Sequence, residues 1–256
     1  MRNIRWQKMA LRAANGLLDG VTALLVLLAV VWSGYALWDN SRVYAAADNV
    51  QAGLLAFKPQ PQEDNSLSFG QLRDINPDVC GWLTLDGTAI DYPVVQGESN
   101  FTYLNTDVYG SFALAGSIFL DVDCDADFSG RYSLLYGHHM ENGAMFGDVA
   151  AFAQADFFAA HTTGSVSLPD AAYTVELFAC LCTDAYDSAV YDPARYQTGV
   201  QPLLDYLAAN AVQQRPSSAD AQAGILALST CAGAETNGRV VVFGWLHPVE
   251  KGDEMQ

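Results

Sequence analysis

The sequence predicts a mainly β fold in which eight short strands close into a barrel. From Val79 onward, short apolar runs are separated by turn-forming residues, which is the pattern of β-strands. Many short strands at this spacing are typical of a barrel. Asp86-Gly87 separates the first two runs and predicts a hairpin with a two-residue turn. The predicted strands are residues 82–85, 88–95, 116–120, 132–136, 165–168, 173–182, 225–230 and 239–246.

Helical segments precede and interrupt these strands. Residues 41–58 place apolar side chains at near-helical spacing, and a short helix capped by Ser68 leads into the barrel. Helical patterns recur at residues 144–160 and 200–213. The second lies within residues 183–223, a connection between the sixth and seventh strands that is long enough to form one wall of a binding groove. We therefore expect an N-terminal helical extension and a helix-containing insertion.

The composition limits the classes of function. A chain of 256 residues with 51% hydrophobic residues can form one sizeable domain and a short appendage. Its 12 basic and 29 acidic residues give a net charge of -17, whereas binding to a phosphate backbone needs clustered lysine and arginine. We therefore expect no nucleic-acid partner.

The N-terminus has the charge pattern of a membrane anchor. An uncharged apolar run at residues 20–38 would span about 29 Å as a helix, close to the thickness of a bilayer's hydrocarbon core. A cleaved signal peptide is the alternative, with Ala45-Ala46-Ala47 as its processing site, although the run exceeds the usual signal-peptide core. Either way the domain works outside the cytoplasm. The basic residues that would keep the N-terminus inside are Arg2, Arg5, Lys8 and Arg12.

Five cysteines occur in a chain expected to be exported, so at least one thiol is unpaired. Cys180 and Cys182 lie two residues apart on a predicted strand, share one face and would not readily bridge each other. Taken singly, each cysteine is best interpreted as a small buried hydrophobe. The other three are Cys80, Cys124 and Cys231.

Cys231 has the setting of a nucleophile. An apolar strand ends on it, and Ala232-Gly233-Ala234 adds little bulk over the sulfur. Arg239 opens the next strand, so neighbouring strands can bring a thiolate and a guanidinium to one end of the sheet. A cation there lowers the pKa of a thiol and donates hydrogen bonds to an oxygen that gains charge, which suits acyl transfer.

His138 is the candidate acid/base because it follows the predicted strand at residues 132–136. His161, in a polar turn, and His247, beside a proline, lack a comparable setting. A lone histidine is usually structural. The combination of this histidine with the cysteine and the arginine is what indicates a site.

A metal site is the competing interpretation. His138, His139 and Cys231 are zinc-type ligands, but adjacent histidines point apart on a strand and no spaced pair supplies the remaining ligands. Residues 121–127 alternate carboxylates, yet they lack the glycine and glutamate of a calcium-binding EF-hand loop. We expect a solvated acidic loop there, no metal and no cofactor.

These residues resemble the sortase family, and within it the class B sortases. Sortases carry a histidine at a strand end, a cysteine ending a Ser-Thr-Cys-like strand and an arginine on the following strand. The resemblance runs from about Leu72 to Val249. Its motifs are Asp91-Tyr92-Pro93-Val94-Val95-Gln96, Asn100 with Leu104, Gly116-Ser117-Ile118-Phe119-Leu120-Asp121, Tyr136-Gly137-His138-His139-Met140 and Met145-Phe146-Gly147-Asp148.

The resemblance implies a sortase-type β-barrel and a membrane-anchored cysteine transpeptidase of Gram-positive bacteria. It implies His138, Cys231 and Arg239 as the catalytic residues. Some class members have an acidic residue directly after the cysteine, and this chain does not. Tyr186 and Tyr191 of the insertion are suggested as further groove residues. The positions that match the lining of the sorting-signal groove are Asn100, Leu104, Tyr136 and Ser229.

In such enzymes the thiolate attacks a threonine carbonyl of the sorting signal, and the thioacyl enzyme passes the acyl group to a peptidoglycan amine. We expect an Asn-Pro-x-Thr or Ser-Pro-x-Thr signal rather than Leu-Pro-x-Thr, because a polar first residue can pair with Asn100. The implied layout is a cytoplasmic N-terminus (1–16), a transmembrane anchor (17–38), a juxtamembrane helix and linker (39–65) and an extracellular catalytic domain (66–256).

Three other functions stay open. A hydrolytic cysteine peptidase would use the same residues without an amine acceptor. A pilus-polymerising sortase is a second alternative, although Asn76-Pro77-Asp78 at the domain entry lacks the aromatic residue of a pilus-type lid. A non-catalytic anchored binding domain, with Cys231 packed in its core, is the third.

Overall fold

The computed structural model describes residues 2–59, 65–216, 223–231 and 237–249. The chain forms two compact units, Met1–Val43 and Tyr44–Gln256. The first unit belongs to helix α1 (Arg2–Leu54). Among the described helices, this is the one that is long and apolar enough to cross a membrane, with a mean hydropathy of 2.0 in its most apolar stretch and none of that stretch buried.

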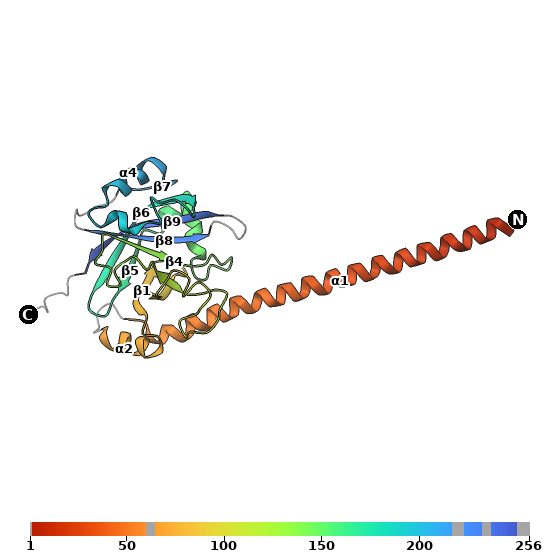
Figure 1. Ribbon diagram of the computed structural model, residues 1–256, viewed down its shortest axis with the longest axis horizontal. Helices are drawn as coiled ribbons and strands as arrows, with labels where there is room; N and C mark the ends of the chain where they lie inside the picture. Colours follow the sequence, from red (N-terminus) through yellow and green to blue (C-terminus); the bar gives the residue numbers. More distant parts are fainter. Residues whose placement is uncertain (1, 60–64, 217–222, 232–236, 250–256) are drawn as a thin grey trace, which may run out of the picture. The chain divides into compact units, whose positions relative to one another are not determined.

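The described strands of the second unit close into an eight-stranded barrel, as the sequence predicts (Figure 1). The order around the ring is β5-β1-β2-β3-β4-β8-β9-β6, and pairing of β5 with β6 closes it. A short further strand, β7 (Gln213–Gln214), pairs with β6 outside the ring. The barrel strands are β1 (Val79–Leu85), β2 (Asp91–Val95), β3 (Ile118–Leu120), β4 (Tyr132–Tyr136), β5 (Thr163–Ser167), β6 (Ala172–Asp184), β8 (Gly224–Cys231) and β9 (Gly238–Pro248).

Two neighbouring pairs in the ring are parallel, β2–β3 and β4–β8. A parallel pair cannot be joined by a tight turn and needs a long crossover connection. The connection from β2 to β3 is residues 96–117, and the chain between β4 and β8 holds most of the remaining elements. Because parallel strands end on the same side, the C-terminal ends of β4 and β8 lie side by side.

The hairpin β1–β2 differs from its prediction. Its connection spans residues 86–90, so the expectation of a two-residue turn is wrong. The Thr88 hydroxyl donates to Leu85 O at 2.9 Å and accepts from Ile90 N at 3.1 Å, and Leu85 N donates to Ile90 O at 2.9 Å. These side-chain bonds stabilise a longer turn that the Asp-Gly signal alone does not predict.

The helices follow the predicted pattern with shifted ends. Ser68 lies inside α2 (Ser66–Ile75) and does not cap it. Residues 144–160 form a 3-10 helix, η2 (Gly147–Ala153), followed by α3 (Ala155–Ala160). The insertion after β6 contains η3 (Pro193–Tyr196) and α4 (Gln201–Asn210), and α4 lies beside β7 over β6 (Figure 1).

The last turns of α1 belong to the core of the second unit. Leu54 is buried in one apolar cluster with Leu72 of α2, Trp82 of β1 and Phe119 of β3. Val50 packs against the same cluster, as does Phe57 in the short 3-10 helix η1 (Leu55–Phe57). Burying such large side chains contributes about 1.5–3 kcal/mol each. Val50, Leu54 and Phe57 are therefore part of the folded barrel unit.

Candidate active site

The predicted catalytic residues lie on three neighbouring strand ends. Cys231 is the last residue of β8, and its Cα partner on β9 is Arg239. On the other side of β8, Tyr136 of β4 pairs with Ser229, and His138 follows two residues after Tyr136. Strand register alone thus brings the three backbones to one end of the barrel. The side chain of Cys231 and the stretch Ala232-Gly233-Ala234 lie outside the described residues.

A pocket with a cavity volume of about 260 Å³ opens at this end of the barrel. The predicted catalytic and sorting-signal residues with described side chains all line it, namely His138, Arg239, Asn100, Leu104, Tyr136 and Ser229. Tyr191 also lines the pocket, whereas Tyr186 is 81% exposed and does not. Lining residues that the sequence reasoning missed are Phe101, Phe119, Gly137, Ala185 and Thr230.

Three aromatic rings stack along one wall of this pocket. The Tyr136 ring lies between Phe119, at a centroid distance of 5.1 Å, and Tyr191, at 6.2 Å. The Tyr191 hydroxyl is 2.8 Å from Ser229 Oγ, which ties the insertion to β8. Burial raises the pKa of Tyr136 far above its usual value. Its hydroxyl therefore stays protonated and acts as a hydrogen-bond donor.

Asp121 supports this wall from inside the protein. Its Oδ2 accepts hydrogen bonds from Tyr136 OH at 2.7 Å and from Asn100 Nδ2 at 2.9 Å. Val122 N donates to Asn100 Oδ1, and Asp123 N donates to Asp121 Oδ1, both at 2.9 Å. At 2% exposure, Asp121 is not part of a solvated acidic loop, so that prediction is wrong for this residue. A buried carboxylate has to be hydrogen-bonded, and here its partners are groove residues.

His138 is held by the connection between β2 and β3. Its Nε2 lies 2.7 Å from Leu104 O. Because a carbonyl only accepts, Nε2 carries a hydrogen in this contact and Nδ1 is left for proton transfer. The preceding Gly137 leaves no room for a side chain, since an added Cβ would lie 2.6 Å from both Ile118 Cδ1 and Phe146 Cγ. We call residues 137–148 the histidine loop.

Arg239 faces the same pocket from β9. It is half-buried, and its Nη1 donates to Gly238 O at 3.0 Å. A guanidinium carries several N–H donors in a fixed planar arrangement, which suits this side chain to bind an anionic oxygen.

The four cysteines with described side chains have poor nucleophilic character. Burial raises the pKa of Cys80, Cys124 and Cys180 to about 12, and desolvation also raises that of Cys182. The thiolate is the reactive form, so a raised pKa disfavours each of these four thiols as a nucleophile. Cys231 is left as the candidate nucleophile.

The closed barrel with a helix-containing insertion between its sixth and seventh strands is the fold of sortases, which are cysteine transpeptidases. No family model matches the chain. The chain is 31% identical over 239 residues to sortase B of Listeria monocytogenes, an alignment that covers 89% of this chain and 96% of that protein. This chain belongs to the sortase B family and is a sortase-type transpeptidase.

Two solved structures resemble the fold closely. The Staphylococcus aureus sortase B–substrate complex matches with a TM-score of 0.72 at 27% identity, covering 83% of this chain and 99% of that one. A Streptococcus pyogenes class B sortase involved in pilus biogenesis matches with a TM-score of 0.65 at 38% identity, covering 70% and 97%. One of these two relatives is thus an enzyme involved in pilus biogenesis.

Proposed function

We propose that this sortase cleaves a sorting signal after its threonine through a thioacyl intermediate on Cys231. The observation that carries the proposal is the convergence of the β8 end, His138 and Arg239 on one pocket. The Cys231 thiolate attacks the threonine carbonyl carbon, and Arg239 stabilises the oxyanion that forms. The C–N bond then breaks as His138 protonates the leaving amine. The product is a thioester and a released C-terminal fragment.

An acceptor amine completes the reaction. It attacks the thioester carbonyl, His138 removes its proton, and the Cys231 thiolate leaves as the new amide forms. Water in place of the amine would give a carboxylic acid and simple hydrolysis. For this chain we propose a peptidoglycan-precursor amine as acceptor, at the outer surface of the membrane.

The pocket supports a signal of the Asn-Pro-x-Thr or Ser-Pro-x-Thr kind. Asn100 uses one N–H on Asp121 and one lone pair on Val122 N, which leaves one donor and one acceptor site. A leucine in first position would leave them unpaired at a cost of about 1–3 kcal/mol each. Proline restricts the peptide backbone and reduces the ordering cost of binding. A complex with substrate exists for the Staphylococcus aureus relative.

We also propose a single-pass topology. The apolar segment of α1 would cross the membrane with residues 1–16 in the cytoplasm, because four basic residues lie on that side of it. The catalytic domain, residues 66–256, would then be extracellular, and residues 39–65 would connect it to the anchor at residues 17–38.

Pilus assembly is the second candidate function. It is favoured by the 38% identity to the class B sortase involved in pilus biogenesis, compared with 27% identity to the Staphylococcus aureus sortase B structure. The two alignments cover different shares of this chain. A pilus enzyme would use the same acylation step and a lysine side chain of the next subunit as its amine.

The proposed function is tested with the full chain in detergent micelles. Peptides with Asn-Pro-x-Thr, Ser-Pro-x-Thr and Leu-Pro-x-Thr signals are offered alone, with a peptidoglycan stem-peptide amine, or with a lysine-containing pilin peptide. We expect mass spectrometry to show a new amide with the stem-peptide amine and a higher kcat/KM for the polar-first peptides. An amide with the pilin lysine alone would replace wall anchoring by pilus assembly. Cleavage without any amide would identify a hydrolase.

A further inference from the structure

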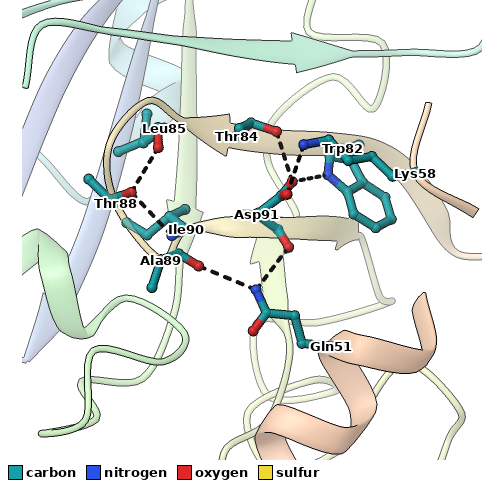
Figure 2. Close-up of polar contacts among 9 residues, drawn as sticks. All are labelled: Gln51, Lys58, Trp82, Thr84, Leu85, Thr88, Ala89, Ile90 and Asp91. Carbon is teal, nitrogen blue, oxygen red and sulfur yellow. Dashed lines mark hydrogen bonds and ion pairs between the residues drawn. The ribbon is translucent and has the colours of Figure 1, made fainter. Parts of the chain in front are cut away.

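The last turns of α1 are bound to the β1–β2 hairpin by one glutamine. Gln51 Nε2 donates to Ala89 O and Asp91 O, each at 3.3 Å (Figure 2). Gln51 Oε1 accepts a hydrogen bond from Tyr92 OH at 3.1 Å. Both ends of the amide are thus engaged, and Gln51 fixes the helix to the strand that carries Tyr92.

Tyr92 joins Gln51 to the histidine loop through its hydroxyl. Its hydroxyl donates to Gln51 and accepts from Met145 N at 2.9 Å. The side chain is 5% exposed, and burial raises the pKa of Tyr92 to about 12. The hydroxyl therefore keeps its proton near neutral pH and holds both bonds at once.

Met145 lies in the histidine loop with an unusual backbone. Its φ is 54°, a left-handed conformation that a residue with a side chain adopts only when its surroundings hold it there. Met145 forms a β-bridge with His139, and Phe146 N donates to His138 O at 3.0 Å. The hydrogen bond from Met145 N to Tyr92 thus fixes the backbone that lies opposite His138 and His139.

A second bond joins the same hairpin to the end of the histidine loop. Ala89 N donates to Asp148 Oδ2 at 2.8 Å, while Ala89 O accepts from Gln51. Asp148 follows directly after Gly147, which begins η2. The hairpin connection therefore lies between the juxtamembrane helix and the histidine loop and contacts both.

We propose that Gln51 and Tyr92 are positioning residues for His138. They fix the histidine loop to the juxtamembrane turns of α1, so that the imidazole reaches the reacting bond from a constant position. The proposal rests on the acid/base role of His138 in the proposed function. It assigns to the juxtamembrane helix a part in turnover as well as in folding, because positioning errors slow proton transfer without weakening peptide binding.

Lys58 offers a matched control on the same segment. Its Nζ forms an ion pair with Asp91 Oδ2 at 2.7 Å (Figure 2). Asp91 Oδ1 accepts from Trp82 Nε1 at 2.7 Å and from Thr84 Oγ1 at 2.9 Å. These partners lie on β1, away from the path that runs through Tyr92. Lys58→Met therefore weakens docking of the juxtamembrane segment but leaves the contact with Met145 in place.

The test compares Tyr92→Phe, Gln51→Met and Lys58→Met in the full chain in detergent micelles. We expect Tyr92→Phe to lower kcat about tenfold while the peptide KM stays within about twofold, since one positioning hydrogen bond is lost. Gln51→Met should lower kcat by a smaller factor, and Lys58→Met should stay within about twofold of the wild type. Amide hydrogen exchange at Met145 should quicken about tenfold in Tyr92→Phe, by a smaller factor in Gln51→Met, and not at all in Lys58→Met.

The outcomes separate this proposal from the proposed function. An unchanged kcat in Tyr92→Phe, or an equal loss of kcat in Lys58→Met, would overturn the positioning role. If the wild type turns over no peptide, the proposed function fails. Hydrogen exchange still tests the contact between Tyr92 and Met145 in that case, and unchanged exchange at Met145 in Tyr92→Phe would overturn the positioning role too. If Tyr92→Phe does not fold, Gln51→Met decides by the same two measurements.

Discussion

The two sides of the pocket are built by different means. On one side, β4, β8 and β9 place residues by strand register, which sets Tyr136 against Ser229 and Cys231 against Arg239. On the other side, the connections at residues 96–117 and 185–191 place residues by individual hydrogen bonds. Register is shared by a whole ladder, whereas a loop contact depends on one or two groups. Strand register thus places Cys231 and Arg239, whereas loop contacts place Asn100, Leu104 and Tyr191.

The largest expected effect is on the strand side. Cys231→Ala should abolish turnover with the fold intact, and Arg239→Lys should lower kcat about 10²–10³-fold, because an ammonium does not reproduce the planar donors of a guanidinium. Steady-state kinetics on the preferred peptide, with circular dichroism as the control for folding, measures both. Substantial activity in either folded variant would contradict the proposed catalytic assignment.

A second change tests how tightly the strand end is joined to the histidine loop. Gly137→Ala places a methyl group 2.6 Å from Phe146 and Ile118. Overpacking of this kind costs about 1–3 kcal/mol, so we expect a lower unfolding midpoint and a lower kcat together. Denaturant unfolding and kinetics on the same sample would show it. The matched control is Gly110→Asn, because an added Cβ there meets nothing within 4 Å and asparagine tolerates its φ of 78°.

On the loop side, Asp121→Asn should raise the peptide KM. Tyr136 and Asn100 both donate to Oδ2 of Asp121, so an amide nitrogen at that position leaves both donors without their acceptor, at a cost of about 1–3 kcal/mol each. We expect KM for the Asn-Pro-x-Thr peptide to rise about fivefold or more with a smaller change in kcat. Asp125→Asn, on an exposed part of the same acidic loop, is the control and should change neither constant. Equal effects from the two variants would contradict a supporting role for Asp121.

The smallest expected effect is a pH dependence of the stability that Asp187 contributes in the insertion. Burial opposes ionisation of Asp187, but hydrogen bonds from Thr183, Tyr206 and Ala189 N outweigh it and lower the pKa below its usual 3.8. A lowered folded-state pKa contributes stability that is complete above 3.8 and is lost as the pH falls through the folded-state value. The difference in unfolding midpoint between the wild type and Asp187→Asn should therefore shrink below about pH 4. A difference that is constant from pH 7 to pH 3 would contradict it.

The contrast between strand register and individual loop contacts also explains what could be predicted from the sequence. The strands, their number and the approach of β8 and β9 follow from short apolar runs and from the adjacency of consecutive strands. The parallel pairing of β4 with β8, which brings His138 to the same end, does not follow from them. The turn at residues 86–90 did not follow, because the Thr88 hydroxyl stabilises a longer connection. The sequence predicts a solvated loop at Asp121 because the partners of this carboxylate, Asn100 and Tyr136, are distant in the sequence and only the fold brings them to it.

Closure of the barrel also limits how a peptide can be recognised. Open sheets often bind an extended peptide as an additional strand, with main-chain hydrogen bonds supplying affinity for almost any sequence. Here β5 pairs with β6, so the eight strands of the described ring have each of their two edges occupied by a neighbour. A bound signal must therefore gain its affinity from side chains and loop backbone at the end of the barrel. In the proposed function, the enzyme therefore recognises a short motif through these groups and gains nothing from adding a substrate strand to its sheet.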